Sequence, residues 1–501
     1  MNLKKNLLFL IFYLVLSGQV LASEKILAVG ICGKKPDMDS ILSCKTRAEK
    51  ILAGTVFNSL FKYSPGSPNS IEAELAESIP KPRMLNSRQY WTVTIKKNVK
   101  FHRLSGGQDY ELEAEDVAFS LELLAGSDDS RLLSGIEIRK ESRYEITLIL
   151  DKPLSPDFFL PMLTGYNGVY IFSRKIFEGK GMFSGTGPFM VASGIGEDSL
   201  YLRVNKSYFK GMPVIDSVRF VFGPDISKME HSLSEGYLDV LIPADDFSDK
   251  IDDKGNDNFK RLYFRNGWLI YLGFNIEAGP FNDKGLRKIT AENIDRDAFC
   301  SNIDGCESLY GLCPLITTAG LTRDEIIRLG LDYGLSDSSR KALPVNTGEQ
   351  VVLCVKSREI PDEIIHKLRD ILKKMGFNLS ADDPEDVITT CRDDACDLKL
   401  LSFETTGSIQ KLLGILMTEN GIDKKYKYLV EASERITSNA RQTDLLKHIQ
   451  IKILADIDIL PLVFIREYAV LKKDIDLGYD CTSQPFFIVM EKTRIANSGN
   501  Q

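Results

Sequence analysis

Apolar and polar residues alternate along several short stretches of this chain. Tyr90–Ile95, Leu200–Val204 and Ser217–Phe222 follow a period of two, which is typical of strands with one buried face. Ile226–Glu235 instead places its apolar residues at helical spacing, and Gly236 follows as a helix terminator. Because strands and helices are interleaved along one stretch, the pattern predicts an α/β fold.

The second half of the chain repeats this mixture in a regular order. Gln350–Val355 is expected to be a strand, Pro361–Met375 an amphipathic helix, and Phe377–Leu379 and Asp397–Leu401 further strands. A strand, a helix and a second strand in succession form a parallel pair, so we expect a parallel sheet covered by helices here. The apolar stretch Ile457–Val463 predicts one more strand.

Composition limits the kinds of protein that fit. The chain has 501 residues, enough for two or three domains, and its 43% hydrophobic and 27% charged residues are ordinary for a soluble globular protein. The net charge is −7, from 70 acidic and 63 basic residues, and no long Lys/Arg block is present. This balance argues against a nucleic-acid partner.

The first residues have the composition of a secretory signal peptide. Lys4 and Lys5 precede the apolar stretch Leu7–Leu16, and small or aliphatic residues follow up to Ala22. The apolar stretch is too short to span a bilayer comfortably. The cleavage region contains no cysteine, so we do not expect a lipid anchor there. We predict cleavage after Ala22 and export of a soluble mature chain.

All nine cysteines lie beyond the signal peptide. Because an exported chain meets an oxidising compartment, disulfides are the default expectation. We predict that Cys391 and Cys396 form a disulfide that closes a small loop, and Cys32 and Cys44 could clamp an N-terminal loop. The odd number leaves at least one thiol that is free or paired between chains.

No motif indicates catalysis or a metal site. The sequence lacks G-x-S-x-G, H-E-x-x-H and the P-loop, and no serine, cysteine or carboxylate motif surrounds His102. The spacing of Cys300, Cys306 and Cys313 does not match the ligand spacing of structural zinc sites. We therefore expect that the protein is not an enzyme and that it binds neither a metal nor a cofactor. We interpret His102 as a structural residue.

Several short sequence motifs of this chain resemble the motifs of one known family. Gly185-Thr186-Gly187-Pro188-Phe189 is similar to a GTGPY turn, Asn205–Asp216 to an N-x-x-Y-W/F-x-G-x-P-x-hydrophobic-D block, and Gly236–Asp239 to a closing G-x-x-D. Ala114–Ser120 resembles A-E-D-V-x-F-S, and Asp295-Arg296 resembles part of an I-D-R motif. Together they resemble the extracytoplasmic solute-binding proteins of peptide-type ABC importers, solute-binding family 5.

This resemblance implies a fold and a division of the chain. The fold is an α/β, bilobal periplasmic-binding-protein fold of type II, in the large peptide-binding class, with an extra subdomain in the first lobe. The chain is expected to cross between the two lobes near Phe264–Asn275 and again near Leu462–Tyr468. The expected division is a signal peptide at 1–22, a first lobe at 23–266 with an inserted subdomain at about 80–165, a second lobe at 267–464, and a C-terminal return to the first lobe at 465–501.

The resemblance also implies a function. A monomeric periplasmic protein would capture a small solute, a peptide or a peptide-like compound, between two closing lobes and deliver it to the permease subunits of an ABC importer in the inner membrane. Two alternatives stay open: a receptor or chaperone-like protein that kept the fold without transport, and a secreted hydrolase with scattered carboxylates. The ligand could equally be a modified peptide, a sugar, an opine or a metal chelate.

The candidate ligand-binding residues follow from the same resemblance. Peptide-binding members carry a tryptophan and an Asp-Pro pair after the strand that corresponds to Asp397–Leu401, and an aspartate there pairs with the peptide's amino terminus. This chain lacks both, and Glu404 could replace the acid. Trp268 and Phe403 are candidate aromatic walls, with interlobe packing as the alternative role of Trp268. The predicted ligand-binding residues are Cys32, Gly33, Lys34, Trp268, Phe403, Glu404, Thr405, Thr406 and Ser408.

Overall fold

The computed structural model describes most of the chain. The described residues are 24–37, 44, 46–64, 67–103, 109–126, 133, 135–180, 184–192, 196–243, 258–301, 303–313, 319–333, 349–356, 360–379, 396–405, 409–436, 438–478 and 492–495. The predicted signal peptide, Cys391, Thr406 and Ser408 lie outside these ranges.

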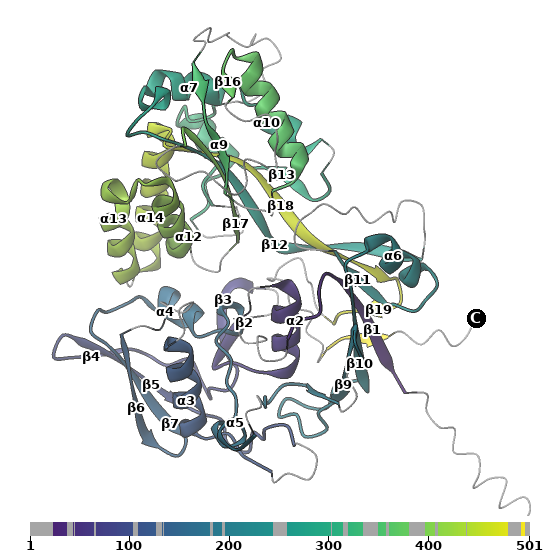
Figure 1. The fold of residues 1–501 in the computed structure, drawn as a ribbon. Helices are drawn as coiled ribbons and strands as arrows, with labels where there is room; N and C mark the ends of the chain where they lie inside the picture. Colours follow the sequence, from purple (N-terminus) through teal and green to yellow (C-terminus); the bar gives the residue numbers. More distant parts are fainter. Residues whose placement is uncertain are drawn as a thin grey trace, which may run out of the picture.

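One large sheet runs through two lobes, which lie one above the other in Figure 1. We call the part that contains β1 to β11 the first lobe and the part that contains α7 to α14 the second lobe. The sheet has the order β15-β17-β12-β18-β11-β1-β10-β9-β8, and β13 pairs with β18. Its strands are β1 (Ile26–Cys32), β8 (Phe189–Val191), β9 (Ser199–Val204), β10 (Ser217–Gly223), β11 (Val240–Ile242), β12 (Phe259–Phe274), β13 (Cys306–Ser308), β15 (Leu353–Val355), β17 (Leu398–Glu404) and β18 (Ile459–Lys472).

The first lobe is centred on the parallel pair β1 and β10. Helix α2 (Arg47–Val56) packs on one face of this pair, and α6 (Ile226–Ser234) packs on the other through Met229 and Leu233. The GTGP turn lies against the end of α2: the amide of Gly187 donates to the carbonyl of Val56, and a Cβ on Gly187 would lie 2.5 Å from the Val56 carbonyl carbon. Only glycine fits so close an approach.

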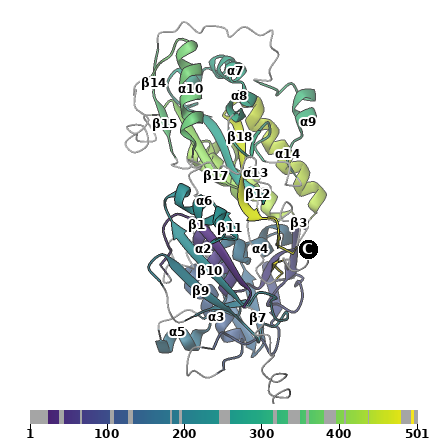
Figure 2. The same cartoon turned by 90° about the vertical axis from the view of Figure 1, so that its right-hand side faces the viewer.

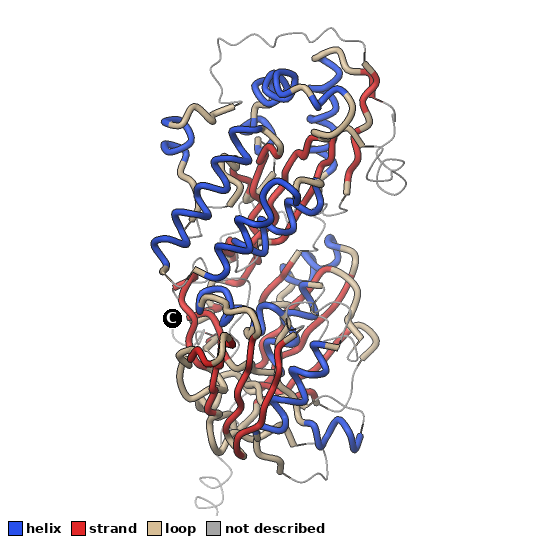
Figure 3. The backbone as a smooth tube through the Cα atoms, turned by 90° about the vertical axis from the view of Figure 1, so that its left-hand side faces the viewer, coloured by secondary structure: helices blue, strands red, loops and turns tan. Residues whose placement is uncertain are grey.

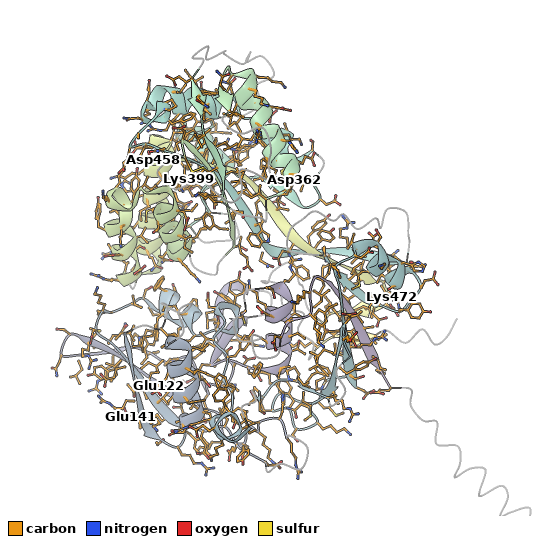
Figure 4. The ribbon with its side chains drawn as sticks, in the orientation of Figure 1. Glu122, Glu141, Asp362, Lys399, Asp458 and Lys472 are labelled. Atoms are coloured by element: carbon orange, nitrogen blue, oxygen red, sulfur yellow. A yellow bond between two sulfur atoms is a disulfide. The ribbon has the colours of Figure 1, made fainter. Side chains whose placement is uncertain are left out.

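Asp239 of the G-x-x-D motif joins three strands of the sheet. Its carboxylate accepts from the amide of Ala28 at 2.8 Å and from Lys472 Nζ at 2.8 Å. Figure 4 labels Lys472 beside α6, where β18 enters the first lobe. The motif therefore has a structural role, because it fastens β1 and β18 to the turn before β11.

A four-stranded sheet with the order β4-β5-β7-β6 forms the outer part of the first lobe. Its core contains Trp91, whose ring centroid lies 4.9 Å from that of Phe159. The elements are β2 (Phe61–Ser64), β3 (Ser67–Ala73), β4 (Arg83–Leu85), β5 (Arg88–Thr94), α3 (Ala114–Ala125), β6 (Ile136–Ser142), β7 (Glu145–Leu150), α4 (Pro156–Met162), η3 (Gly165–Asn167) and α5 (Arg174–Lys180). This sheet occupies the range predicted for an inserted subdomain, although its independence as a unit stays a prediction.

Helices cover both faces of the sheet in the second lobe (Figures 2 and 3). One face packs against α7 (Lys284–Asn293), α8 (Arg296–Cys300) and α10 (Asp362–Lys374), and the other against α12 (Ile409–Asn420), α13 (Asp423–Arg435) and α14 (Asn439–Asp456). The remaining elements are η4 (Pro280–Asn282), α9 (Arg323–Arg328), β14 (Gln350–Val351), β16 (Asn378–Leu379), β19 (Ile475–Asp476) and β20 (Arg494–Ile495).

The predicted parallel sheet of the second lobe is confirmed only in part, because β12 pairs antiparallel with both β17 and β18, and β13 pairs antiparallel with β18. β15 and β17 are parallel neighbours in the large sheet, and β14 and β16 form a separate parallel pair. The stretch predicted as one strand from Gln350 to Val355 is thus divided into β14 and β15, which join different sheets.

Strands β12 and β18 form the connection between the lobes. They pair from Phe259 opposite Lys472 to Tyr263 opposite Tyr468, and again from Gly267 opposite Arg466 onward. The register shifts between these two parts, which marks an irregularity of the kind that bends a sheet. Gly267, Arg466 and Tyr468 at this shift lie within the ranges predicted for the lobe crossings, and Tyr263 precedes the first range by one residue.

The disulfide predicted between Cys391 and Cys396 is wrong. Cys396 is bonded to Cys354, and a second disulfide joins Cys300 to Cys306. Sequence proximity favoured Cys391, but the parallel pairing of β15 with β17 places the Cα atoms of Cys354 and Cys396 5.8 Å apart. Among the described residues, no helix is both long enough and apolar enough to span a bilayer.

Candidate functional site

The first turn of α2 is anchored to the strand connection between the lobes. Arg47 forms an ion pair of 3.2 Å with Glu467 of β18 and donates to the carbonyl of Pro243 at 2.8 Å. Asn266 of β12 donates to the other oxygen of Glu467 at 2.6 Å. All three side chains are buried, so this polar network fixes the orientation of α2 relative to the β12–β18 connection between the lobes.

One turn further along α2, Lys50 reaches across to the second lobe. Its ammonium forms an ion pair with Glu404, the last residue of β17 in the second lobe. The two side chains are 18% and 28% exposed, so the pair is only partly hydrated. Glu404 lies directly opposite Trp268 in the β12–β17 pairing, which puts both side chains on the same face of the sheet.

Tyr166 makes the next contact between the lobes. Its hydroxyl, in η3 of the first lobe, donates to the carbonyl of Thr405. Thr405 is held in turn by Gly267: its amide donates to the Gly267 carbonyl at 2.8 Å, and its hydroxyl accepts from the Gly267 amide at 3.1 Å. Burial and the charge of Glu404 raise the pKa of Tyr166, so this phenol remains a donor.

Tyr63 lies beside Tyr166 in an edge-to-face contact, with ring centroids 5.7 Å apart. The Tyr63 hydroxyl is buried and has no hydrogen-bond partner among the described residues. Such a hydroxyl is costly without a partner, and a bound solute is one group that could supply it.

A second lysine enters from the second lobe. Lys411, in the first turn of α12, lies 3.5 Å from Oδ1 of Asn167 on the first lobe. Burial lowers the pKa of its ammonium, Lys50 lowers it further, and Glu404 opposes both effects. We call Lys50, Tyr166, Glu404, Thr405 and Lys411 the cleft cluster.

A further contact, which we call the rim clasp, joins the lobes through α4 and the α13–α14 turn. Gln442 Nε2 donates to the hydroxyl of Ser155 and to the carbonyl of Ser433, each at 2.9 Å, and the amide of Ser155 donates to the carbonyl of Glu434 at 2.7 Å. These bonds reach the carbonyls of Ser433 and Glu434 in the last turn of α13, and the Ser433 carbonyl also accepts from the amide of Ile436 at 3.3 Å. Burial and the neighbouring Glu431 raise the pKa of the Glu434 carboxyl to about 7.

The structure brings together only part of the predicted site. Glu404 and Thr405 belong to the cleft cluster, and Trp268 is half-buried beside Glu404. Phe403 faces the opposite side of the sheet, where its ring centroid lies 6.1 Å from that of Tyr271 in the core under α12. Its ligand contact remains a prediction.

The end of β1 is held by the first lobe. Cys32 packs beneath α6 with Met229 and Leu233, and the amide of Gly33 donates to the carbonyl of Gly223 at 2.9 Å. Lys34 is exposed. Ligand contacts of Cys32, Gly33 and Lys34 likewise remain predictions.

Sequence reasoning missed Lys50, Tyr166 and Lys411. Lys50 occupies an ordinary polar position of an amphipathic helix, and Tyr166 follows a proline-containing stretch without a motif. Only Lys411 carried a usable signal, because it comes three residues after the predicted specificity segment Phe403–Ser408.

The first lobe also has a groove of its own, with a volume of about 750 Å³. Its lining includes Lys100, Arg103, Arg203 and Asp216, all from the first lobe. It is therefore distinct from the cleft cluster, whose residues come from both lobes. No group of three or more metal-binding side chains occurs among the described residues.

The sequence and the fold are similar to those of known binding proteins. Residues 70–318 match the family model "Bacterial extracellular solute-binding proteins, family 5 Middle". The uncharacterised protein YhjP of Bacillus subtilis is 27% identical over 270 residues, which are 50% of this chain and 40% of YhjP. The oligopeptide-binding protein AppA of Bacillus subtilis is 26% identical over 282 residues, which are 50% of this chain and 49% of AppA. The match thus spans about half the length of these relatives, or less.

A solved structure matches over nearly the whole chain. MoaA of A. tumefaciens R10, a periplasmic binding protein in complex with mannopinic acid, is 19% identical with a TM-score of 0.71, covering 95% of this chain and 100% of MoaA. At this identity the similarity establishes a shared bilobal fold.

Proposed function

Because this chain belongs to the bacterial extracellular solute-binding proteins of family 5, we propose that it is the solute-binding component of an ABC importer. The bilobal α/β fold expected from the sequence is confirmed. In this proposal the two lobes close on a small solute and present it to permease subunits in the inner membrane. The protein acts as a monomer in the periplasm after removal of its signal peptide.

The observation that carries the proposal is the meeting of polar side chains from both lobes in the cleft cluster. Lys50 and Tyr166 belong to the first lobe, and Glu404, Thr405 and Lys411 belong to the second. The strands β12 and β18 connect the lobes beside this cluster, so a modest bend there changes the separation of its two halves. A solute that contacts both halves favours the closed form through those contacts.

Peptides and peptide-like compounds are the solute class that the relatives support. AppA is named an oligopeptide-binding protein, and MoaA was solved with mannopinic acid. Among the described residues, the cleft offers hydrogen-bonding groups and charges of both signs, which suit a small polar solute.

Binding, not catalysis, is the role we propose. Burial lowers the pKa of His102 to about 4, and its Nε2 lies 2.9 Å from the carbonyl of Gly187. A neutral, buried imidazole bonded to a backbone carbonyl is suited to structure and not to general-base chemistry.

Ligand copurification followed by uptake tests this function. The protein is isolated from the periplasm of its native host, and bound compounds are identified by mass spectrometry. We expect a small solute in stoichiometric amount, and loss of its uptake in a deletion strain that is restored by the wild-type chain. A bound solute whose uptake is unchanged in the deletion strain would favour a receptor role, and chemical turnover of that solute would favour an enzyme.

A further inference from the structure

The carboxylate that the sequence singled out for a ligand's amino group already has a partner within the protein. Lys50 of α2 reaches from the first lobe and pairs with Glu404 at the end of β17. Both side chains are largely withdrawn from solvent, with exposures of 18% and 28%. A ligand that took Glu404 for its own ammonium would displace Lys50 and leave this lysine partly buried beside the ligand.

Lys411 adds a second ammonium to the same place. It enters from α12, contacts Asn167 of the first lobe and lies within the electrostatic influence of both Lys50 and Glu404. Among the described side chains of the cleft cluster, two ammonium groups therefore surround one carboxylate.

The environment of these lysines favours an acidic partner. An ammonium withdrawn from water loses hydration, and a carboxylate with good geometry restores the lost interaction better than a neutral amide does. Tyr166 and Tyr63 lie in edge-to-face contact on the first-lobe side of this cluster. A solute with an acidic group can therefore reach the lysines without disrupting the pair that fixes the end of β17.

We propose that Lys50 and Lys411 are specificity determinants that select solutes carrying a carboxylate, while Glu404 holds Lys50 in position. This inference rests on the proposed binding function and names the class of its ligand. It differs from the expectation drawn from the sequence, in which Glu404 itself paired with a ligand's ammonium.

Two nearly isosteric peptides test the inference. The mature protein, freed of bound compounds by mild denaturant and refolded, is titrated calorimetrically with Ala-Ala-Glu-Ala and Ala-Ala-Gln-Ala. Both peptides are amidated at the C-terminus, so that the glutamate side chain carries the one carboxylate of the pair. These peptides differ only by a carboxylate in place of an amide. We expect the glutamate peptide to bind roughly tenfold more tightly or better, the range of a hydrogen bond to a charged group.

Substitutions of the two lysines test whether they cause the preference for the glutamate peptide. Lys411→Met keeps the apolar stem and removes the ammonium, so the preference should fall to about twofold or less. Lys50→Met should reduce it as well. Lys399→Met is the matched control, because Lys399 Nζ donates to the carbonyl of Glu419 within the second lobe. Figure 4 labels Lys399 in that lobe, at the start of β17.

Equal or tighter binding of the glutamine peptide, or a preference that survives in both Lys50→Met and Lys411→Met, would overturn the inference. If neither peptide binds, the charge of the copurified compound decides whether the inference holds. An acidic compound that is not a peptide would support the inference while refuting the peptide class. A neutral or cationic compound would refute the inference while leaving the transport function intact.

Discussion

Gln442 Nε2 donates a hydrogen bond of 2.9 Å to the hydroxyl of Ser155, although the two residues lie on different lobes. Ser155 precedes α4, yet its hydroxyl does not cap that helix and is directed to Gln442 instead. Closure of the lobes thus satisfies groups that opening would return to water. The rim clasp should therefore contribute to the balance between open and closed forms even without a solute.

Removal of the clasp should open the ligand-free protein. We expect Gln442→Ala to favour the open form by about 1–3 kcal/mol, since it removes the bond to the Ser155 hydroxyl that joins the two lobes. Small-angle scattering should show a larger radius of gyration. Gln450→Ala is the control, because Gln450 is buried and bonded to Ala319 within the second lobe, at 2.7 Å. Equal radii for wild type and Gln442→Ala would refute this role.

Reversal of the ion pair between Lys50 and Glu404 should show coupling between the lobes. Lys50→Glu and Glu404→Lys each place like charges together, so each should increase the radius of gyration without a solute. The double variant restores opposite charges and should recover most of the closure, with a coupling of about 1 kcal/mol or more. Additive effects of the two substitutions would show that the pair does not contribute to closure.

A side chain at position 267 should destabilise the β12–β18 connection between the lobes. A Cβ there would lie 2.0 Å from the carbonyl oxygen of Ile465 and 2.8 Å from the Cα of Arg466, and both are backbone atoms. We expect Gly267→Ala to lower the free energy of unfolding by roughly 1–3 kcal/mol, in the range of other overpacked sites. Gly414→Ala in α12 meets nothing within 4 Å and should instead raise stability by up to about 1 kcal/mol. Urea unfolding of both variants measures the contrast, and equal effects would contradict it.

The two disulfides should differ in their contribution to stability. Cys354 and Cys396 are 42 residues apart, whereas Cys300 and Cys306 are six apart. Chain entropy predicts about 4 kcal/mol for the longer loop and about 2 kcal/mol for the shorter one. Non-reducing peptide mapping should identify both links, and unfolding of the two double-serine variants should rank them in this order. A peptide that links Cys391 to Cys396 would contradict the structure.

Acid should destabilise the protein partly through His102. Its pKa in the folded protein is about 4, below the ordinary 6.5, so the unfolded chain takes up a proton first as the pH falls. The contribution of neutral His102 is complete above about pH 6.5 and is lost progressively down to about pH 4, for a total of about 3 kcal/mol. His102→Gln should lose stability less steeply over this interval in urea unfolding. Parallel curves for the two proteins would refute the assignment.

The sequence alone determined the local elements and their class. Alternation in Leu200–Val204 and Ser217–Phe222 predicted β9 and β10, and the helical spacing of Pro361–Met375 predicted α10. These features depend on contacts between near neighbours in the sequence and on which face of an element is buried. They can therefore be predicted from the order of the residues. The ordered motifs also identified the family correctly.

Only the tertiary structure decided which distant residues meet. Lys50 and Glu404 lie 354 positions apart, and no local pattern connects them. Cys396 was matched to its neighbour Cys391 because sequence shows proximity along the chain, whereas the pairing of β15 with β17 brought Cys354 to it. Phe403 and Glu404 are adjacent, yet the period of two of a strand directs one into the core and the other into the cleft. The site depends on strand register and on the approach of two lobes, and both are set by packing over the whole molecule.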